Sequence, residues 1–317
     1  MKIIFLGTPG FAVPSLDILV KNGYEIPAVI TAPDKPAGRG QKLNESEVKK
    51  YALEQGLNVL QPVRLSDPLF LEEVKSLGAD LQVVVAFRMM PEALWSMPVH
   101  GTFNLHGSLL PQYRGAAPIN RAIMNGESKT GVTTFFLKHE IDTGNIVFRE
   151  EIPIGPDETA GELHDRMMLV GAELVLKTVR ALESGNLQLH DQSAFMNSGI
   201  VLKPAPKIFK DDCRLDFSMP VAHLHNIVRG LSPFPGAFFD LELADGQMIQ
   251  VKVLRSSKEE AGTVLTHELL TDGKTYLKIA AADGFLKILE LQLPGKKRMK
   301  TEEVLRGFRF PVDASIR

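Results

Sequence analysis

The chain has almost no cysteine, since Cys213 is the single one among 317 residues. One cysteine cannot form a disulfide within the chain, and this shortage also excludes a metal site built from several thiolates. The sequence lacks any apolar run close to the roughly 18 residues that cross a bilayer. Its first residues run directly into a strand-like segment with no leader before it. We therefore expect a cytoplasmic protein.

An excess of charge of one sign is missing as well. Lys and Arg number 36 and Asp and Glu number 38, which gives a formal net charge of −2. This balance excludes a protein that is basic throughout, but it does not exclude a local basic face. From residue 205 onward there are 17 Lys and Arg against 15 Asp and Glu, with a basic run at 296–300. Any contact with nucleic acid must therefore depend on where the charges lie.

Short apolar runs rich in β-branched residues alternate with segments of helical period in the first part of the chain. This alternation is typical of a mostly parallel sheet covered by helices, and it predicts an α/β domain of Rossmann-like topology. The expected strands are residues 2–6, 26–31, 58–60, 81–87, 102–105, 131–137 and 145–154. The expected helices are residues 12–22, 45–55, 67–77, 92–97 and 158–182.

The pattern changes after Gly185. Turn and extended signals at 198–206 indicate a linker, and one short helix is expected at 221–229. Five strands follow, separated by Asp-Gly and Gly turns, at residues 237–243, 248–255, 262–265, 276–280 and 286–293. Five short strands suit a small β-barrel, of which the OB-fold is one form. The predicted organisation is a catalytic domain at 1–190, a linker at 191–206 and a small barrel domain at 207–317.

Two polar residues, Asn104 and His106, stand near the end of an expected strand. Because side chains alternate along a strand, both lie on the same face, at the carboxyl end where open α/β sheets bind ligands. An amide donor and an imidazole at one point can stabilise an oxyanion and transfer a proton during acyl transfer. The alternative is a pair of residues that merely end the strand, but the long Pro- and Gly-containing loop that follows favours a binding loop.

A carboxylate is still needed to orient the histidine or to relay its proton. Asp142 is the candidate, in a polar turn between two expected strands, where Asp-Thr-Gly is equally ordinary turn chemistry. Glu140 competes with it. Sequence reasoning alone brings neither carboxylate next to His106.

Three motifs then carry a resemblance to a known family. Residues 104–111 read NLHGSLLP, residues 113–119 read YRGAAPI and residues 142–144 read DTG. Together they resemble the signature of the folate-dependent formyltransferases. Within that superfamily the Pro-Ala-Gly-Arg-Gly segment at 36–40 and the Pro-Gly-Lys-Lys segment at 294–297 resemble the methionyl-tRNA formyltransferases. The resemblance spans almost the whole chain.

This resemblance implies a catalytic group of Asn104, His106 and Asp142. The donor would be 10-formyltetrahydrofolate, and the acceptor would be the α-amino group of methionine on initiator tRNA, for translation initiation. Asn104 and a protonated His106 would stabilise the oxyanion, while Asp142 orients His106 and assists proton transfer through water. The resemblance implies no metal, no redox cofactor and no covalent intermediate, and we expect a monomer.

The resemblance also implies two sets of binding residues. The folate would be bound by Phe87, Arg88, Met89, Ser108, Leu109, Leu110 and Pro111. The tRNA would be bound by Arg39, Lys42, Lys207, Lys296 and Lys297. One departure from the family lies on the folate side, where Phe87 and Arg88 stand in place of the usual Tyr-Gly pair.

Three other functions are compatible with parts of the pattern. A formyltransferase that acts on a nucleotide-linked amino sugar would share the Asn-x-His loop and an OB-like second domain. A hydrolase that releases formate from the folate would need no amine acceptor. A tRNA- or folate-binding module without activity is disfavoured by the complete set of Asn104, His106 and Asp142.

Overall fold

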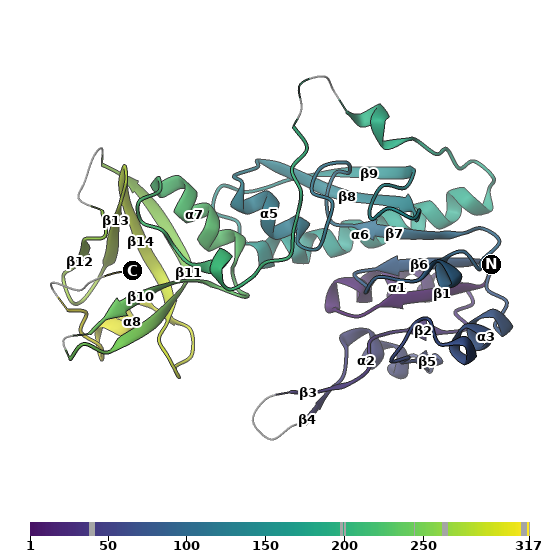
Figure 1. Cartoon of the computed structure of the whole chain (residues 1–317), viewed down its shortest axis with the longest axis horizontal. Coiled ribbons are helices and arrows are strands. Elements are labelled where there is room, and N and C mark those ends of the chain that lie inside the picture. Colours follow the sequence, from purple (N-terminus) through teal and green to yellow (C-terminus); the bar gives the residue numbers. More distant parts are fainter. Residues whose placement is uncertain are drawn as a thin grey trace. The chain divides into compact units, whose positions relative to one another are not determined.

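The structure is a computed structural model, and it describes residues 1–37, 42–196, 199, 201–243, 245–261, 266–311 and 316 (Figure 1). By packing, the chain forms two compact units. The first comprises Met1–Gly115, Thr130–Ile152 and His164–Pro204, and the second Ala116–Lys129, Pro153–Leu163 and Ala205–Arg317. Neither unit is one continuous stretch of sequence. The domain limits expected from the sequence, at residues 190 and 206, remain a prediction.

A seven-stranded sheet in the order β5-β2-β1-β6-β7-β8-β9 forms the centre of the first unit (Figure 1). In that order the strands span Val59–Leu60, Val29–Ile30, Ile3–Gly7, Leu81–Val85, Thr102–His106, Lys129–Phe136 and Ile146–Pro153. The pairs from β5 to β7 are parallel, and β8 pairs antiparallel with β7. The predicted Rossmann-like α/β domain with a mostly parallel sheet is thereby confirmed.

Helices connect the strands of this sheet. They are η1 (Gly10–Ala12), α1 (Val13–Lys21), α2 (Glu47–Glu54), α3 (Pro68–Ser76), α4 (Glu92–Trp95), α6 (Ala160–Glu183) and η2 (Gln192–Phe195). Polar side chains fix the starts of two of them: Ser46 accepts a hydrogen bond from the Lys49 N–H (3.1 Å), and Asp67 accepts one from the Leu69 N–H (2.9 Å). A short hairpin of β3 (Lys35–Ala37) and β4 (Lys42–Asn44) was not expected from the sequence. No helix among the described residues combines the length and apolarity that crossing a membrane requires.

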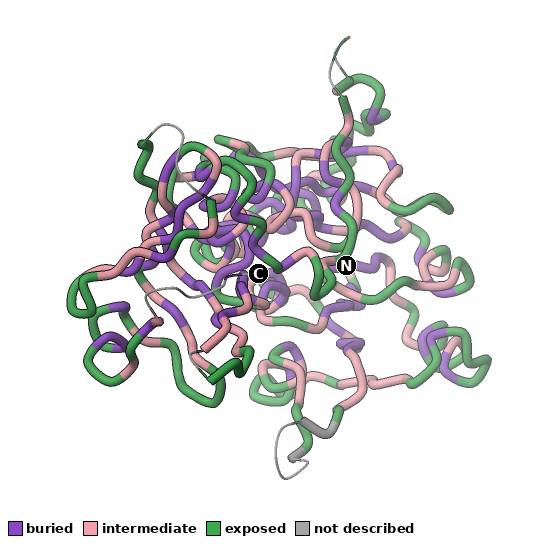
Figure 2. The backbone as a smooth tube through the Cα atoms, turned by 60° about the vertical axis from the view of Figure 1, so that its left-hand side comes forward, coloured by how far each residue is buried: buried purple, intermediate pink, exposed green. Residues whose placement is uncertain are grey.

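The central strands are buried along their whole length. Every residue of β1 and of β6 is buried, as expected for parallel strands that helices cover on both faces (Figure 2). The chain leaves β1 for β2 and β5 and then returns to β6 on the other side of β1. The direction of winding therefore reverses between β1 and β6. The carboxyl ends of β1, β6 and β7 form the edge of the sheet at which such folds bind their ligands.

The second unit contains a six-stranded antiparallel sheet. Its strands are β10 (Ala237–Glu242), β11 (Met248–Glu260), β12 (Leu269–Thr271), β13 (Leu277–Ala281), β14 (Gly284–Gln292) and β15 (Met299–Lys300). Its helices are α5 (Pro118–Met124), η3 (Asp211–Cys213), α7 (Val221–Gly230) and α8 (Thr301–Leu305). The small barrel-like β-domain predicted for this region is confirmed. The expected strand at 262–265 lies outside the described residues, and β12 and β15 were not expected.

The long strand β11 pairs irregularly with its neighbour β14. Its pairing with β14 shifts register between Val253 and Arg255 and again between Arg255 and Ser256. Register shifts of this kind accompany a locally increased twist of a strand. The sheet packs against a core of aromatic and aliphatic side chains.

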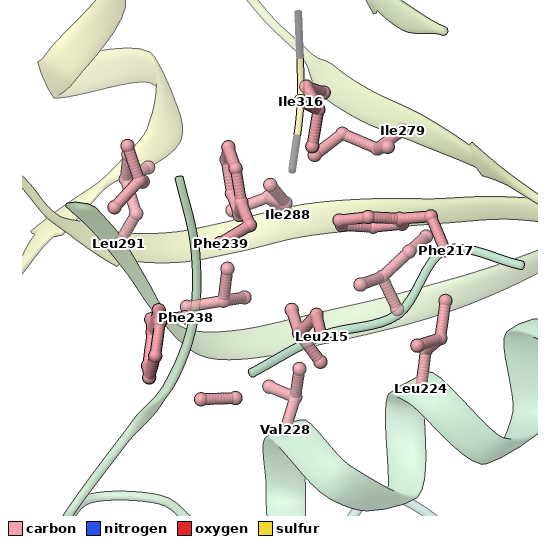
Figure 3. Packing of buried hydrophobic residues seen from close by; sticks show 14 of the residues in the cluster. Leu215, Phe217, Leu224, Val228, Phe238, Phe239, Ile279, Ile288, Leu291 and Ile316 are labelled. Atoms are coloured by element: carbon pink, nitrogen blue, oxygen red, sulfur yellow. The ribbon is translucent and has the colours of Figure 1, made fainter. Parts of the chain in front are cut away.

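Two phenylalanines lie at the centre of that core. Phe217 and Phe239 are both 0% exposed, and their ring centroids lie 5.8 Å apart at an interplanar angle of 80° (Figure 3). Edge-to-face packing of this kind contributes about 0.5–1.5 kcal/mol beyond the burial of apolar area. Leu224 and Val228 of α7 belong to the same cluster and join the helix to the sheet.

We expect Phe239→Ala to lower the free energy of unfolding of the second unit by about 3–5 kcal/mol, because it opens a cavity in this core. Phe234→Ala is the matched control, since Phe234 is 80% exposed, and we expect it to change stability by less than about 0.5 kcal/mol. Urea denaturation of the whole chain measures both. Equal losses in the two variants would contradict this description of the core.

Candidate active site

Strand β7 brings two of the predicted residues to the carboxyl edge of the sheet. Asn104 and His106 are two positions apart on β7, so they share a face, and His106 is 6% exposed. Parallel pairing with β6 on one side and antiparallel pairing with β8 on the other fixes the strand in place. Asn104 and His106 therefore lie on the same face of β7, as the sequence predicts.

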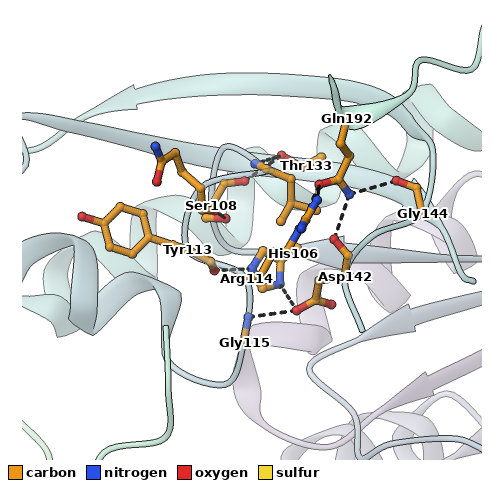
Figure 4. Close-up of polar contacts among 11 residues, drawn as sticks. His106, Ser108, Tyr113, Arg114, Gly115, Thr133, Asp142, Gly144 and Gln192 are labelled. Atoms are coloured by element: carbon orange, nitrogen blue, oxygen red, sulfur yellow. Dashed lines mark hydrogen bonds and ion pairs between the residues drawn. The ribbon is translucent and has the colours of Figure 1, made fainter. Parts of the chain in front are cut away.

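The main chain determines the protonation of the His106 ring. Its Nε2 lies 2.9 Å from the carbonyl oxygen of Tyr113 (Figure 4). A carbonyl oxygen only accepts hydrogen bonds, so Nε2 must carry a proton. The second ring nitrogen, Nδ1, faces Asp142, with 3.8 Å between Nδ1 and the carboxylate Oδ2. The Nδ1 atom is therefore the one that can exchange a proton.

A strained turn positions Asp142 in the loop between β8 and β9. Its φ is +56°, in the left-handed region that non-glycine residues seldom adopt. Its Oδ2 accepts a hydrogen bond from the Gly115 N–H (2.9 Å), and its side chain is 12% exposed. The competing carboxylate, Glu140, is exposed. Of the two carboxylates that the sequence left open, the structure brings Asp142 to His106.

Asn104 contains a buried acceptor without a donor. Its side-chain oxygen is shielded from solvent and makes no hydrogen bond to any residue that the structure describes. An acceptor left unpaired in this way costs about 1–3 kcal/mol. Its position on β7, on the same face as His106, marks a place where a substrate can supply the missing donor.

Hydrogen bonds shape the loop that follows β7. The Thr133 hydroxyl of β8 donates to the Ser108 carbonyl oxygen (2.6 Å) and accepts from the Leu110 N–H (3.2 Å). The Ser108 hydroxyl donates to the Gln112 carbonyl oxygen (2.6 Å). Leu110 is 0% exposed and packs with Phe135. These hydrogen bonds and the buried Leu110 side chain hold the loop against β8.

Two families match the chain, one over each part. The family described as formyl transferase matches residues 1–179, and the family described as formyl transferase, C-terminal domain, matches residues 207–309. The chain belongs to the formyl transferase family.

Curated relatives align with this formyl transferase from end to end. A methionyl-tRNA formyltransferase of Bacteroides thetaiotaomicron is 51% identical over 98% of this chain and 96% of its own length. A methionyl-tRNA formyltransferase of Flavobacterium johnsoniae is 48% identical over 100% of this chain and 99% of its own.

Solved structures of low identity share the fold. An N-formyltransferase from Helicobacter canadensis, in complex with folinic acid and dTDP-3-aminofucose, has a TM-score of 0.65 at 21% identity and covers 94% of this chain and 100% of its own. HypX from Aquifex aeolicus, in complex with tetrahydrofolic acid, has a TM-score of 0.64 at 19% identity and covers 96% of this chain and 47% of its own.

The residues predicted to bind the folate lie on two loops of this formyl transferase. Phe87, Arg88 and Met89 follow β6, where Arg88 donates to the carbonyl oxygens of Val63 (3.0 Å) and Pro62. Its guanidinium lies 5.8 Å from the centre of the Phe87 ring, and burial lowers the pKa of Arg88 below its ordinary value. The other residues predicted to bind the folate are on the loop after β7. Ser108, Leu110 and Pro111 are buried, and Leu109 is half-buried.

A pocket of about 510 Å³ lies beside the Asp142 turn of this formyl transferase. It is lined by Trp95, Leu137, Lys138, His139, Glu140 and Thr143. Trp95 meets His139 edge to face at 5.8 Å. No group of three His, Cys, Asp or Glu side chains that could hold a metal ion occurs among the residues described.

The residues predicted to bind tRNA are spread along the chain. Lys207, Lys296 and Lys297 are exposed in the second unit. Lys42 belongs to β4, but its side chain lies outside the description, and Arg39 lies outside the described residues altogether.

Sequence reasoning missed several groups that build this site. Tyr113 and Gly115 belong to the motif at 113–119, but sequence patterns assign their main-chain atoms no role, and Thr133 is an ordinary strand threonine. Gln192 was also missed, although its amide lies 2.8 Å from the Asp142 carbonyl oxygen. Only contact with an already recognised residue identifies such groups.

We expect Thr133→Val to lower the free energy of unfolding by about 1–3 kcal/mol, because the carbonyl of Ser108 and the N–H of Leu110 lose their buried partner. Thr133→Ser keeps the hydroxyl and should lose much less. Urea denaturation compares the two variants. A loss of the same size in Thr133→Ser, which keeps the hydroxyl, would show that these hydrogen bonds do not carry the effect.

Proposed function

We propose that this formyl transferase moves the formyl group of 10-formyltetrahydrofolate to the α-amino group of methionine on initiator tRNA. The observation that carries this proposal is the 51% identity to a methionyl-tRNA formyltransferase along 98% of the chain. The product, N-formylmethionyl-tRNA, is used to initiate translation. We accordingly place the protein in the cytoplasm, with initiator tRNA and a reduced folate as its substrates.

In this proposal the three polar side chains around the end of β7 carry the chemistry. The amine lone pair attacks the formyl carbon, and the carbonyl electron pair moves to the oxygen. The Asn104 amide N–H and the Nδ1–H of a protonated His106 donate to that oxyanion, and donors of this kind are usually the largest single source of stabilisation in acyl transfer. The carbonyl then re-forms as the bond to N10 breaks. The attacking nitrogen loses one proton and N10 gains one, which gives the formylated amine and tetrahydrofolate.

The unpaired oxygen of Asn104 supports an amine as the acceptor. This buried atom has no donor among the described residues. The N–H groups of an attacking amine supply one, while the other half of the same amide donates to the oxyanion on the neighbouring atom. A water acceptor, as in a formate-releasing hydrolase, offers the same donor but none of the binding energy of a tethered amine.

His106 and Asp142 manage the proton in this proposal. Because Nε2 is committed to the Tyr113 carbonyl, Nδ1 takes up and releases the proton. The carboxylate of Asp142, 3.8 Å away, stabilises the imidazolium form and leaves room for exchange through water.

Both substrates have candidate surfaces. The pocket beside the Asp142 turn combines an indole, an aliphatic wall and Lys138, which suits a folate with its flat ring system and acidic tail. We propose that residues 87–89 and 108–111 also contact the folate. For the tRNA we propose phosphate contacts from Lys207, Lys296 and Lys297, together with Arg39 and Lys42 from their place in the sequence.

We expect His106→Ala and Asp142→Asn each to reduce the rate of formyl transfer by about 100-fold or more, since one removes the oxyanion donor and the other its charged partner. Binding of methionyl-tRNA should stay within about threefold. Asp165→Asn is the matched control, because Asp165 is 71% exposed. Single-turnover rates and filter binding measure the two effects. Near-normal turnover in either site variant would falsify the assigned mechanism.

The acceptor distinguishes this function from its alternatives. The intact chain is incubated with labelled 10-formyltetrahydrofolate and, in separate reactions, methionyl-initiator tRNA, methionyl-elongator tRNA, a nucleotide-linked amino sugar, or no acceptor. We expect label on the initiator tRNA at a rate at least about tenfold above every other arm. Preferential labelling of the sugar, or formate released equally in all arms, would replace the proposal by one of the two alternatives.

A further inference from the structure

Gln192 is a buried polar side chain that the catalytic mechanism does not yet use. It begins η2, in the segment 191–206 predicted as a linker, and it is 3% exposed. Its backbone is held independently of its side chain. The neighbouring His190 exchanges two main-chain hydrogen bonds with Ile146 of β9 (2.8 and 2.9 Å), and the Asp191 carboxylate accepts from the Ser193 N–H (2.9 Å).

The amide of Gln192 uses its full hydrogen-bonding capacity on two loops of the site. Its Nε2 donates to the carbonyl oxygens of Asp142 (2.8 Å) and Gly144 (2.9 Å). Its Oε1 accepts from Arg114 Nε (3.1 Å) and Nη2 (2.5 Å) (Figure 4). Two donors meet two atoms that only accept, and the oxygen meets a group that only donates. The amide therefore has one workable orientation.

One of the two carbonyls that Gln192 binds belongs to Asp142, the residue with the strained φ, and the other belongs to Gly144, two residues later. A non-glycine residue at φ +56° is strained and persists only where its surroundings hold it. Gly144 restricts the turn further, since a Cβ there would lie 1.6 Å from the Phe136 carbonyl oxygen. Gln192 binds the turn on both sides of Thr143, and the Gly115 N–H binds the carboxylate itself.

We propose that Gln192 is a positioning residue for formyl transfer, which holds the Asp142 carboxylate opposite His106 Nδ1 by binding the main chain of the Asp142 turn. This inference rests on the proposed function, in which Asp142 is catalytic. Arg114 acts on the same point from the other loop, because its guanidinium fixes the Gln192 amide and its neighbour Gly115 supplies the N–H to Asp142. Displacement of a catalytic group by about 1 Å can cost up to 100-fold in rate.

Two substitutions test the role of the amide in the intact chain. Gln192→Met keeps the shape and removes every hydrogen bond, whereas Gln192→Glu keeps an acceptor for Arg114 and removes the donors to Asp142 and Gly144. We expect kcat to fall about 10- to 100-fold in both variants, with KM for each substrate within about threefold. Gln82→Met is the matched control, because Gln82 is fully buried but lies near the amino-terminal end of β6, away from the carboxyl edge of the sheet. The kcat of this variant should not change. Normal kcat in Gln192→Glu would overturn the proposal.

A double-mutant cycle separates positioning from simple loss of stability. If Gln192 acts through Asp142, then Gln192→Met should change kcat less than about twofold once Asp142→Asn is present. An equal fall in both backgrounds would show a structural role only and would overturn the inference. Single-turnover kinetics at high enzyme concentration measures the rates in the slow Asp142→Asn background. Near-normal turnover in Asp142→Asn alone would instead refute the catalytic assignment of Asp142, so the two failures are distinct.

Discussion

The hydrogen bond from His106 Nε2 to the Tyr113 carbonyl oxygen is the interaction on which the rest of the site depends. It fixes one protonation form of a buried imidazole and aims the other nitrogen at Asp142. The parallel sheet places His106 at the right edge, but a strand end alone would leave the ring free to turn. The loop after β7 therefore contributes to the site mainly through its main chain. Leu110 and Pro111 in this loop are apolar and buried.

The sequence predicted the architecture well where the physical signal was local. Alternating apolar runs located β1, β6 and β7 to within two residues, because burial on both faces demands continuous apolar sequence. It also placed Asn104 and His106 on one face of a strand. Residue patterns alone did not choose between Asp142 and Glu140, and only the family resemblance named Asp142. The contact with His106 depends on a positive φ and on a hydrogen bond from Gly115, which is distant in sequence. The short strands β12 and β15 escaped for a related reason, because two or three residues carry no measurable period.

The division of the chain by packing shows another limit of sequence patterns. Residues 116–129 and 153–163 pack with the β-domain, although both lie within the sequence that reads as one α/β domain. Within that second unit, Asn120 of α5 donates to the Gly230 carbonyl oxygen (2.8 Å), and Arg229 binds the carbonyls of Gly155 and Glu158 (3.3 Å each). These contacts join segments up to 110 residues apart. No pattern along the chain reveals which distant carbonyl a buried arginine will bind.

Gln192 and Lys203 bind both loops of the site from a later part of the chain. The sheet, α6 and the three proposed catalytic side chains all lie before residue 190, and the first of the two family matches ends at 179. Yet the Tyr113 N–H, whose carbonyl holds His106, donates to the Lys203 carbonyl oxygen (2.7 Å), and the Asp142 turn is held by Gln192. Synthesis from the N-terminus therefore makes the proposed catalytic groups before it makes the residues that bind their loops.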